Sequence, residues 1–122
     1  MITRDELLQA VATVTIADAD IGGAIPANMR RFIYRIRLGN AFAGPNLLTL
    51  GHRENGAGVT TNIDYVQLAV QYDIVADPEE LTEHAMPLYI IEGAGAGGAS
   101  HLRGVMSAGD AYLTYWYIDA EA

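Results

Sequence analysis

The sequence predicts an all-β protein: a single-domain antiparallel β-sandwich of jelly-roll-like architecture over residues 1–122. Two observations lead to this prediction. Side chains alternate in character over residues 30–38 and again over 66–74, and a period of two is typical of a strand with one face on a core. Turn residues separate about seven such runs at short intervals, and the chain has no strand–helix–strand unit and no internal repeat. This spacing is typical of sandwiches and barrels.

Composition narrows the class of protein. The 122 residues fit one domain, and a hydrophobic content of 51% is enough for a core. No uninterrupted apolar run of about 18 residues is present, so we expect no membrane partner, and the early charges of MITRDELLQAV argue against a secretory signal. The chain has no cysteine, which excludes disulfides and Cys-type zinc sites. A net charge of −8 makes nucleic acid an unlikely partner, because phosphate contacts need a basic surface.

The N-terminus allows two interpretations. Residues 4–12 fit a short helix, with Thr3 as N-cap and Leu7, Leu8 and Val11 spaced for one face. The alternative is an N-terminal arm over residues 1–11.

The remaining elements follow from β-branched and alternating runs between turn residues. The expected strands cover residues 12–17, 29–38, 47–53, 59–75, 87–92, 101–106 and 111–119. The expected turns and loops cover residues 18–23, 40–46, 54–58, 93–100 and 107–110, and residues 77–81 open a helical turn or an acidic loop.

The strand over residues 29–38 is long and rich in arginine. Strict alternation places Arg30, Phe32, Tyr34, Ile36 and Leu38 on the expected core face. It places Ile33 with three arginines on the other face: Arg31, Arg35 and Arg37. In an acidic chain these cations need carboxylate partners. The partners lie either on an adjacent strand of the same sheet or on a neighbouring subunit.

The last strand carries aromatic residues on both faces. Alternation places Tyr112 and Trp116 on one face and Tyr115 and Tyr117 on the other. When a strand carries large side chains on both faces, the core buries one face and something else buries the other. A subunit contact is the usual explanation for the second face. The alternative is a central strand under a long loop.

Other candidate sites have simpler explanations. Asp18 and Asp20 share a tight loop that suits a hard cation, but the loop has no further oxygen ligands and fits an acidic turn. The glycines of residues 93–98 have no following Lys-Ser/Thr, so they do not form a phosphate loop. His52, His84 and His101 are too widely spaced for the cupin pattern, and neither serine, Ser100 or Ser107, lies in a nucleophile elbow.

The segment IPANMRRFIYRIRLGN resembles the entry into a long strand in small all-β virion proteins. These are decoration or cement proteins of phages and archaeal viruses, and related jelly-roll fibre modules. Ile25, Pro26, Ala27, Arg31 and Asn40 carry the resemblance, within 16 of the 122 residues. It implies a homo-oligomeric shell or surface component without catalysis, with a trimer favoured. The implied partners are copies of the chain and a major capsid or shell protein, on a virion or an extracellular surface.

We therefore expect a non-enzymatic structural protein that self-assembles and needs no cofactor or metal. The predicted interface residues are Arg31, Arg35, Arg37, Tyr112, Tyr115, Trp116 and Tyr117. Two other classes stay open. One is a carbohydrate- or ligand-binding sandwich, which an exposed Tyr112 or Trp116 in a groove would favour. The other is a cupin-like metal-dependent enzyme.

Overall fold

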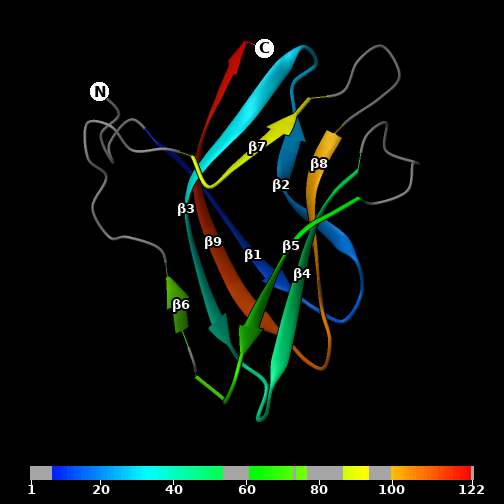
Figure 1. Cartoon of the computed structure of the whole chain (residues 1–122), viewed down its shortest axis with the longest axis vertical. Helices are drawn as coiled ribbons and strands as arrows, with labels where there is room; N and C mark the ends of the chain where they lie inside the picture. The colour runs from blue at the N-terminus through cyan, green and yellow to red at the C-terminus, as the bar shows by residue number, and fades with distance from the viewer. Residues whose placement is uncertain (1–6, 54–60, 73, 77–86, 94–99, 122) are drawn as a thin grey trace.

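The computed structural model describes residues 7–53, 61–72, 74–76, 87–93 and 100–121. Within these ranges the chain forms β-strands and no helix (Figure 1). The strands are β1 (Leu8–Val14), β2 (Ala19–Ile25), β3 (Met29–Asn40), β4 (Asn46–Arg53), β5 (Thr61–Leu68), β6 (Ile74–Ala76), β7 (Tyr89–Glu92), β8 (Ser100–Met106) and β9 (Ala111–Glu121). The predicted all-β class is confirmed.

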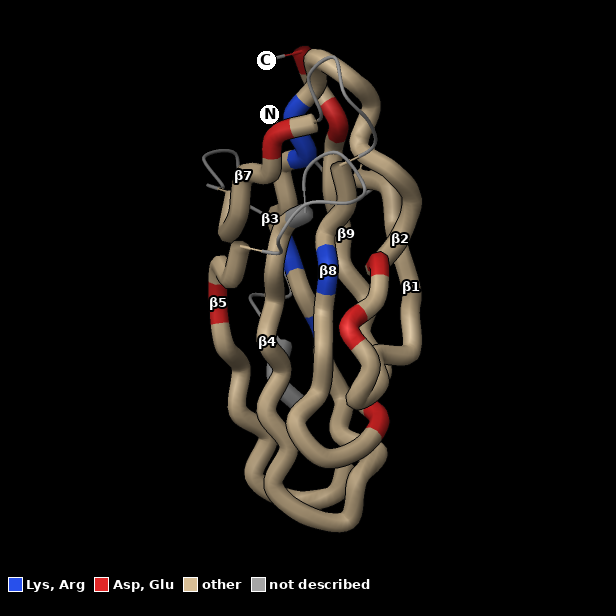
Figure 2. Tube along the Cα trace, turned by 90° about the vertical axis from the view of Figure 1, so that its right-hand side faces the viewer, with Lys and Arg blue, Asp and Glu red and all other residues tan. Residues whose placement is uncertain are grey.

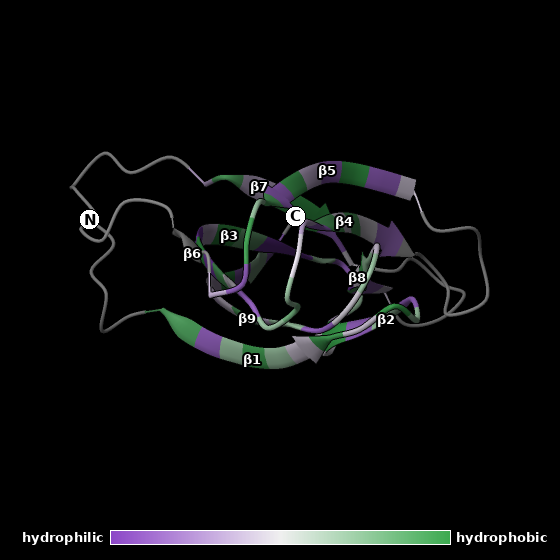
Figure 3. Ribbon diagram, turned by 90° about the horizontal axis from the view of Figure 1, so that it is seen from below, coloured by the Kyte–Doolittle hydropathy of each residue, from purple (hydrophilic) through white to green (hydrophobic). Residues whose placement is uncertain are grey.

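The strands form two antiparallel sheets that pack face to face. The five-stranded sheet has the order β1-β9-β3, and β6 and β7 pair with opposite ends of β3. The four-stranded sheet has the order β2-β8-β4-β5. Figure 3 views the molecule end-on and shows one sheet on each side. The predicted β-sandwich is therefore confirmed.

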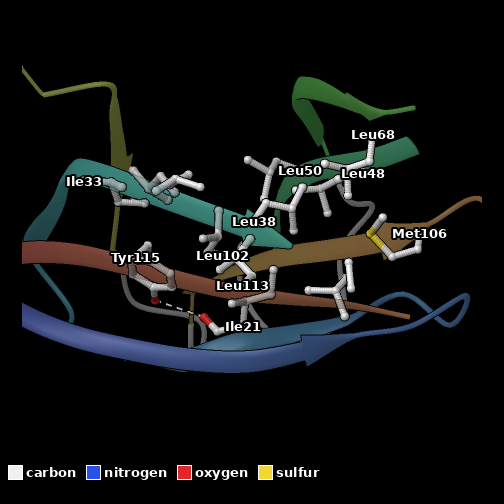
Figure 4. Close-up of a cluster of buried hydrophobic side chains, with 14 of the residues drawn as sticks. Ile21, Ile33, Leu38, Leu48, Leu50, Leu68, Leu102, Met106, Leu113 and Tyr115 are labelled. Atoms are coloured by element: carbon white, nitrogen blue, oxygen red, sulfur yellow. Dashed lines mark hydrogen bonds between the residues drawn. The ribbon is translucent and has the colours of Figure 1, made fainter. Parts of the chain in front are cut away.

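The core lies between the sheets and is mainly aliphatic. Leu38 and Leu113 of the five-stranded sheet face Leu48, Leu50 and Leu102 of the other, and all five are fully buried (Figure 4). Burying one such side chain stabilises the fold by about 1.5–3 kcal/mol. The alternation of apolar residues along each strand thus selects which faces meet.

Tyr115 is the one aromatic side chain among the fully buried residues of the described core. Its hydroxyl donates a hydrogen bond of 3.0 Å to the carbonyl oxygen of Ile21 on β2, in the opposite sheet (Figure 4). Gly22 follows with a φ of +79°, and a Cβ there would overlap the Tyr115 hydroxyl. The close approach of β2 to Tyr115 therefore requires glycine at position 22.

β3 contains a β-bulge that the sequence pattern does not reveal. Its register with β9 shifts between Ile33 and Arg35. Arg31 and Ile33 are buried before the bulge, whereas Ile36 is buried after it. The extra residue changes which alternate positions face the core. The prediction that Arg31 shares a face with Arg35 and Arg37 is therefore wrong.

Two other segments differ from their predicted form. The N-terminal helix over residues 4–12 is wrong where the structure describes it, because Leu8–Val14 pairs with β9 as strand β1. Ala10 and Ala12 there pack against the core at alternate positions. The turn predicted over residues 18–23 is wrong as well, because β2 begins at Ala19 and pairs with β8, with an irregular register after Ile21.

The strand predicted over residues 59–75 is also shorter than expected. β5 ends at the buried Leu68, and residues 69–72 turn the chain towards β6 in the other sheet. Tyr72 in this turn has a φ of +64°. The hairpin turn predicted at 54–58, the acidic segment at 77–81 and residues 94–99 of the glycine loop lie outside the described residues.

Two buried asparagines tie three connections together at one end of the sandwich. Asn40 Nδ2 donates to the carbonyl oxygens of Gly44 and Val70, each at 2.9 Å. Asn46 Nδ2 donates to the Gly109 carbonyl oxygen at 2.8 Å and to Asn40 Oδ1 at 3.3 Å. The connections β3–β4, β5–β6 and β8–β9 are thus held against one another, and we call this group the asparagine cluster.

Gly22→Ala is expected to destabilise the fold, and Gly23→Ala to change it little. Alanine at position 22 would adopt a left-handed backbone and overlap the Tyr115 hydroxyl, which together cost about 2 kcal/mol or more. A Cβ on the neighbouring Gly23 meets no atom within 4 Å. Urea denaturation of both variants measures the difference. Equal losses would contradict the close packing of Tyr115 on β2.

Candidate functional site

Arg31 is an internal cation, 2% exposed, on the core side of β3. It lies opposite Asp119 on β9, and its Nε and Nη2 donate to the two carboxylate oxygens at 2.8 and 2.9 Å. Its Nη1 donates to the carbonyl oxygen of Gly23 at 2.9 Å and to the Tyr115 hydroxyl at 3.1 Å. The guanidinium carbon also lies 4.1 Å from the ring centre of Tyr117. We call these contacts the Arg31 clamp.

The clamp joins β3 and β9 to β2 of the opposite sheet. Burial opposes the charge on Arg31, but the hydrogen bond and charge of Asp119, with Tyr115, outweigh it and raise the pKa of Arg31. Burial also raises the pKa of Tyr115, and Arg31 offsets this only in part. Both groups therefore keep their protons at neutral pH, as the hydrogen bonds require.

The predicted interface residues divide between the two faces of the sheet. Tyr115 is fully buried and Tyr117 packs against the core, whereas Tyr112 is 60% exposed. The predicted division of the aromatic side chains of β9 between two faces is therefore confirmed. Arg31 pairs with a carboxylate of an adjacent strand in its own sheet, which was the alternative to a subunit contact. A subunit contact of Arg35, Arg37, Tyr112 and Trp116 stays a prediction.

The outer face of the five-stranded sheet carries apolar and aromatic side chains in cross-strand rows. Register places Phe32 between Ile90 of β7 and Ile118 of β9, with Ile90 54% exposed. The next rows pair Trp116 with Arg35 and Thr114 with Arg37. At the outer strand, β1 adds Val11, which is 68% exposed. We call this surface the aromatic face. Its members are Val11, Phe32, Arg35, Ile90, Trp116 and Ile118.

Arg35 lies at the centre of the aromatic face. Its guanidinium carbon is 4.6 Å from the ring centre of Trp116. Among the described residues no carboxylate lies within ion-pair distance of Arg35 or Arg37. The Nε of Arg35 is shielded from solvent and has no hydrogen-bond partner in the same part of the chain. A shielded donor without a partner costs about 1–3 kcal/mol, so the described residues do not complete the polar contacts of Arg35.

The outer face of the four-stranded sheet is different in character. Arg103 of β8 pairs with Asp18 and Asp20, and His101 Nε2 lies 3.8 Å from Asp20 Oδ2. Figure 2 shows a basic position on β8 beside acidic positions near the start of β2. The two carboxylates suggested as cation ligands thus hold an arginine. This face satisfies its own charges, which is typical of a solvated surface.

A hollow of about 450 Å³ lies at the end of the outer face where β3 meets the 69–72 turn. Its lining includes Arg37, Gly39, Gln71, Tyr72, Tyr112 and Thr114. Tyr72 is 79% exposed and keeps a positive φ, which is uncommon for a bulky residue. The sequence could not show this site because its three segments are distant along the chain.

Ser100 is hydrogen-bonded to His52. The Ser100 hydroxyl also donates to the Glu92 carbonyl oxygen at 2.8 Å. Since a hydroxyl has one proton, His52 Nε2 must donate to Ser100 Oγ, and activation of a serine nucleophile needs the opposite direction. The pair therefore connects β4, β7 and β8 structurally.

Over the described ranges, no three His, Cys, Asp or Glu side chains gather as a metal site would require. His84 lies outside these ranges. The same part of the chain contains no helix of the length and hydropathy that a membrane span needs.

Comparisons of the chain with family models, curated proteins and solved structures give no match.

Arg31→Met is expected to destabilise the fold by about 3 kcal/mol, because it leaves Asp119 partly buried without a partner. Arg30 of the same strand is the matched control. It pairs with Glu92 at 3.2 Å on the surface, so Arg30→Met should cost about 1 kcal/mol or less. Urea denaturation measures both variants. Replacing both charges, as in Arg31→Met with Asp119→Leu, should recover part of the loss, and no recovery would contradict a buried pair.

The raised pKa of Tyr115 gives the fold a dependence on alkaline pH. In the unfolded chain this hydroxyl ionises near pH 10, whereas in the folded chain it keeps its proton to a higher pH. The contribution of Tyr115 to the free energy of unfolding should therefore be fully present below about pH 10. Above this pH the free energy of unfolding should fall by up to about 1.4 kcal/mol per pH unit. Urea denaturation at several pH values measures this slope. Tyr115→Phe should flatten it, and a slope that only Tyr112→Phe reduces would refute the assignment.

Proposed function

We propose that this chain is a non-enzymatic structural protein that assembles with copies of itself through the aromatic face. One observation leads to the proposal. Exposed and half-buried apolar side chains form adjacent rows around an arginine that has no carboxylate within reach in the described residues. Apolar and aromatic residues with arginine are enriched in the buried centres of protein interfaces.

The contrast between the two outer faces supports this choice of surface. The four-stranded sheet pairs Arg103 with its own Asp18 and Asp20. The outer face of the five-stranded sheet pairs Arg30 with Glu92, but it exposes Val11 and Ile90 and leaves Arg35 without a carboxylate within reach among the described residues. A facing copy of an acidic chain supplies both apolar cover and carboxylates. The free energy of assembly then comes mainly from apolar burial, and Arg–carboxylate pairs fix the register.

The strand order supports a jelly roll as the finer description of the fold. A jelly roll divides eight strands between two sheets by two Greek keys. With β6 and β7 counted as two parts of one strand beside β3, the orders β1-β9-β3-β6 and β2-β8-β4-β5 follow that pattern. Viral capsid proteins are one of the classes that use it.

The resemblance of residues 25–40 to virion decoration proteins points to a shell or surface component. On this basis the preferred assembly is a trimer, and a major capsid or shell protein is the second partner. The role is passive, because the rigid sandwich presents a preformed surface and performs no chemistry.

Arg35→Glu is expected to weaken assembly more than folding. The substitution removes the stack on Trp116 and places a carboxylate against an acidic copy, which costs several kcal/mol in a buried interface. Native mass spectrometry should show smaller species, and the melting temperature should change little. Tyr65→Ser is the matched control, because Tyr65 is 58% exposed on the other sheet. An Arg35→Glu protein with a lower melting temperature and unchanged mass would contradict the proposal, as would a wild-type monomer at micromolar concentration.

A further inference from the structure

The hollow beside Arg37 lies at the end of the sandwich that the asparagine cluster holds together. Its wall at Tyr72 is fixed by a hydrogen bond of 2.9 Å from the Tyr72 backbone nitrogen to the Asn40 carbonyl oxygen. Asn40 itself belongs to the asparagine cluster, which holds the 69–72 turn through Val70. The exposed Tyr72 ring is thus presented by a strained backbone that buried contacts hold in place. Strained residues of this kind cluster at ligand sites.

The lining combines flat apolar surfaces with polar groups. Tyr72 and Tyr112 supply two exposed rings, and Gln71 and Thr114 supply an amide and a hydroxyl. Gly39 supplies open space, since a Cβ there would meet no atom within 4 Å. The volume of about 450 Å³ is within the usual range for small-ligand sites.

The charge of the hollow is opposite to that of the chain. Arg37 lines it, and of the described residues that line it none is acidic, although the chain has 15 Asp and Glu residues. Among the described residues Arg37 has no carboxylate within ion-pair distance. An exposed guanidinium without an internal partner favours a carboxylate or similar anion, which it can hold with two parallel hydrogen bonds.

We propose that this hollow binds an acidic sugar, of the uronic-acid class, within an oligosaccharide. A pyranose ring has an apolar C–H face that stacks on tyrosine, and its hydroxyl groups match the amide and hydroxyl of the lining. Its carboxylate pairs with Arg37. An acidic peptide carries the same charge but lacks the flat ring with hydroxyls on its edge. The site is separate from the centre of the aromatic face, and its proposed ligand is not a copy of the chain.

Isothermal titration calorimetry of the 122-residue chain with trigalacturonic acid tests this proposal. We expect saturable binding with a dissociation constant of about 1 mM or tighter. The neutral galactose trisaccharide should bind roughly tenfold more weakly, because it cannot pair with Arg37. Acetate and a triglutamate peptide should show no saturable binding in the same range.

Substitutions in the hollow test the roles of the arginine, the tyrosine ring and the open space separately. Arg37→Gln should weaken binding of the acidic trisaccharide roughly tenfold or more and leave the neutral one unchanged. Tyr112→Ala should weaken both sugars by several-fold. Gly39→Val should block both by filling the hollow, and a Cβ at position 39 meets no neighbouring atom. The melting temperature of each variant shows whether the fold is retained, and its native mass separates a loss of sugar binding from a loss of assembly.

Tyr65→Ala is the matched control, because Tyr65 is as exposed as Tyr112 but lies on the other sheet. It should bind as the unsubstituted protein does. The proposal is overturned if neither sugar binds at about 10 mM. It is also overturned if Tyr65→Ala weakens binding as much as Tyr112→Ala, or if acetate or triglutamate binds as well as the acidic sugar.

Discussion

The pairing of Arg31 with Asp119 is the constraint on which the rest of the sandwich depends. Buried charges are costly unless they are paired and fully hydrogen-bonded, and here the arginine makes four close donor contacts to residues on two other strands, β9 and β2. Its position fixes β3 against β9 and both against β2. That placement brings Tyr115 to Ile21 and requires the glycine at position 22. The apolar core supplies most of the stability, and the clamp fixes the relative positions of the two sheets at one end.

The two ends of the molecule are therefore held by different interactions, and its two outer faces differ in character. Charge holds one end through Arg31, and amide groups hold the other through Asn40 and Asn46. With both ends fixed, the outer face of the five-stranded sheet need not contribute to folding. It can carry the exposed Val11 and Ile90 next to the half-buried Trp116, Phe32 and Ile118. Interaction surfaces are commonly found on this kind of rigid scaffold.

Local pattern was sufficient for the fold class but not for the site. The alternation around Phe32 and the turn residues near Gly109 predict strands and connections, because both are properties of neighbouring residues. The bulge after Ile33 arises from pairing with β9, more than 70 positions along the chain, and the local residues are all good strand formers. The Arg31–Asp119 pair joins residues 88 positions apart. The hollow likewise forms only when β3, β9 and the 69–72 turn meet, so a one-dimensional pattern predicted neither the clamp nor the hollow.

Because of the bulge, the number of residues in β3 decides which of its side chains face the core. One added residue separates an internal arginine from the two outward-facing ones, although all three occur in a uniform alternating run. Removing a single codon elsewhere in the strand, such as that of Ile36, would shift the residues on one side of it by one position against β9 and exchange their environments. Guanidinium groups would then enter the aliphatic layer, or isoleucine and leucine would face solvent. This strand therefore tolerates conservative replacements far better than insertions or deletions, and variation among related chains should preserve its residue count more strictly than its composition.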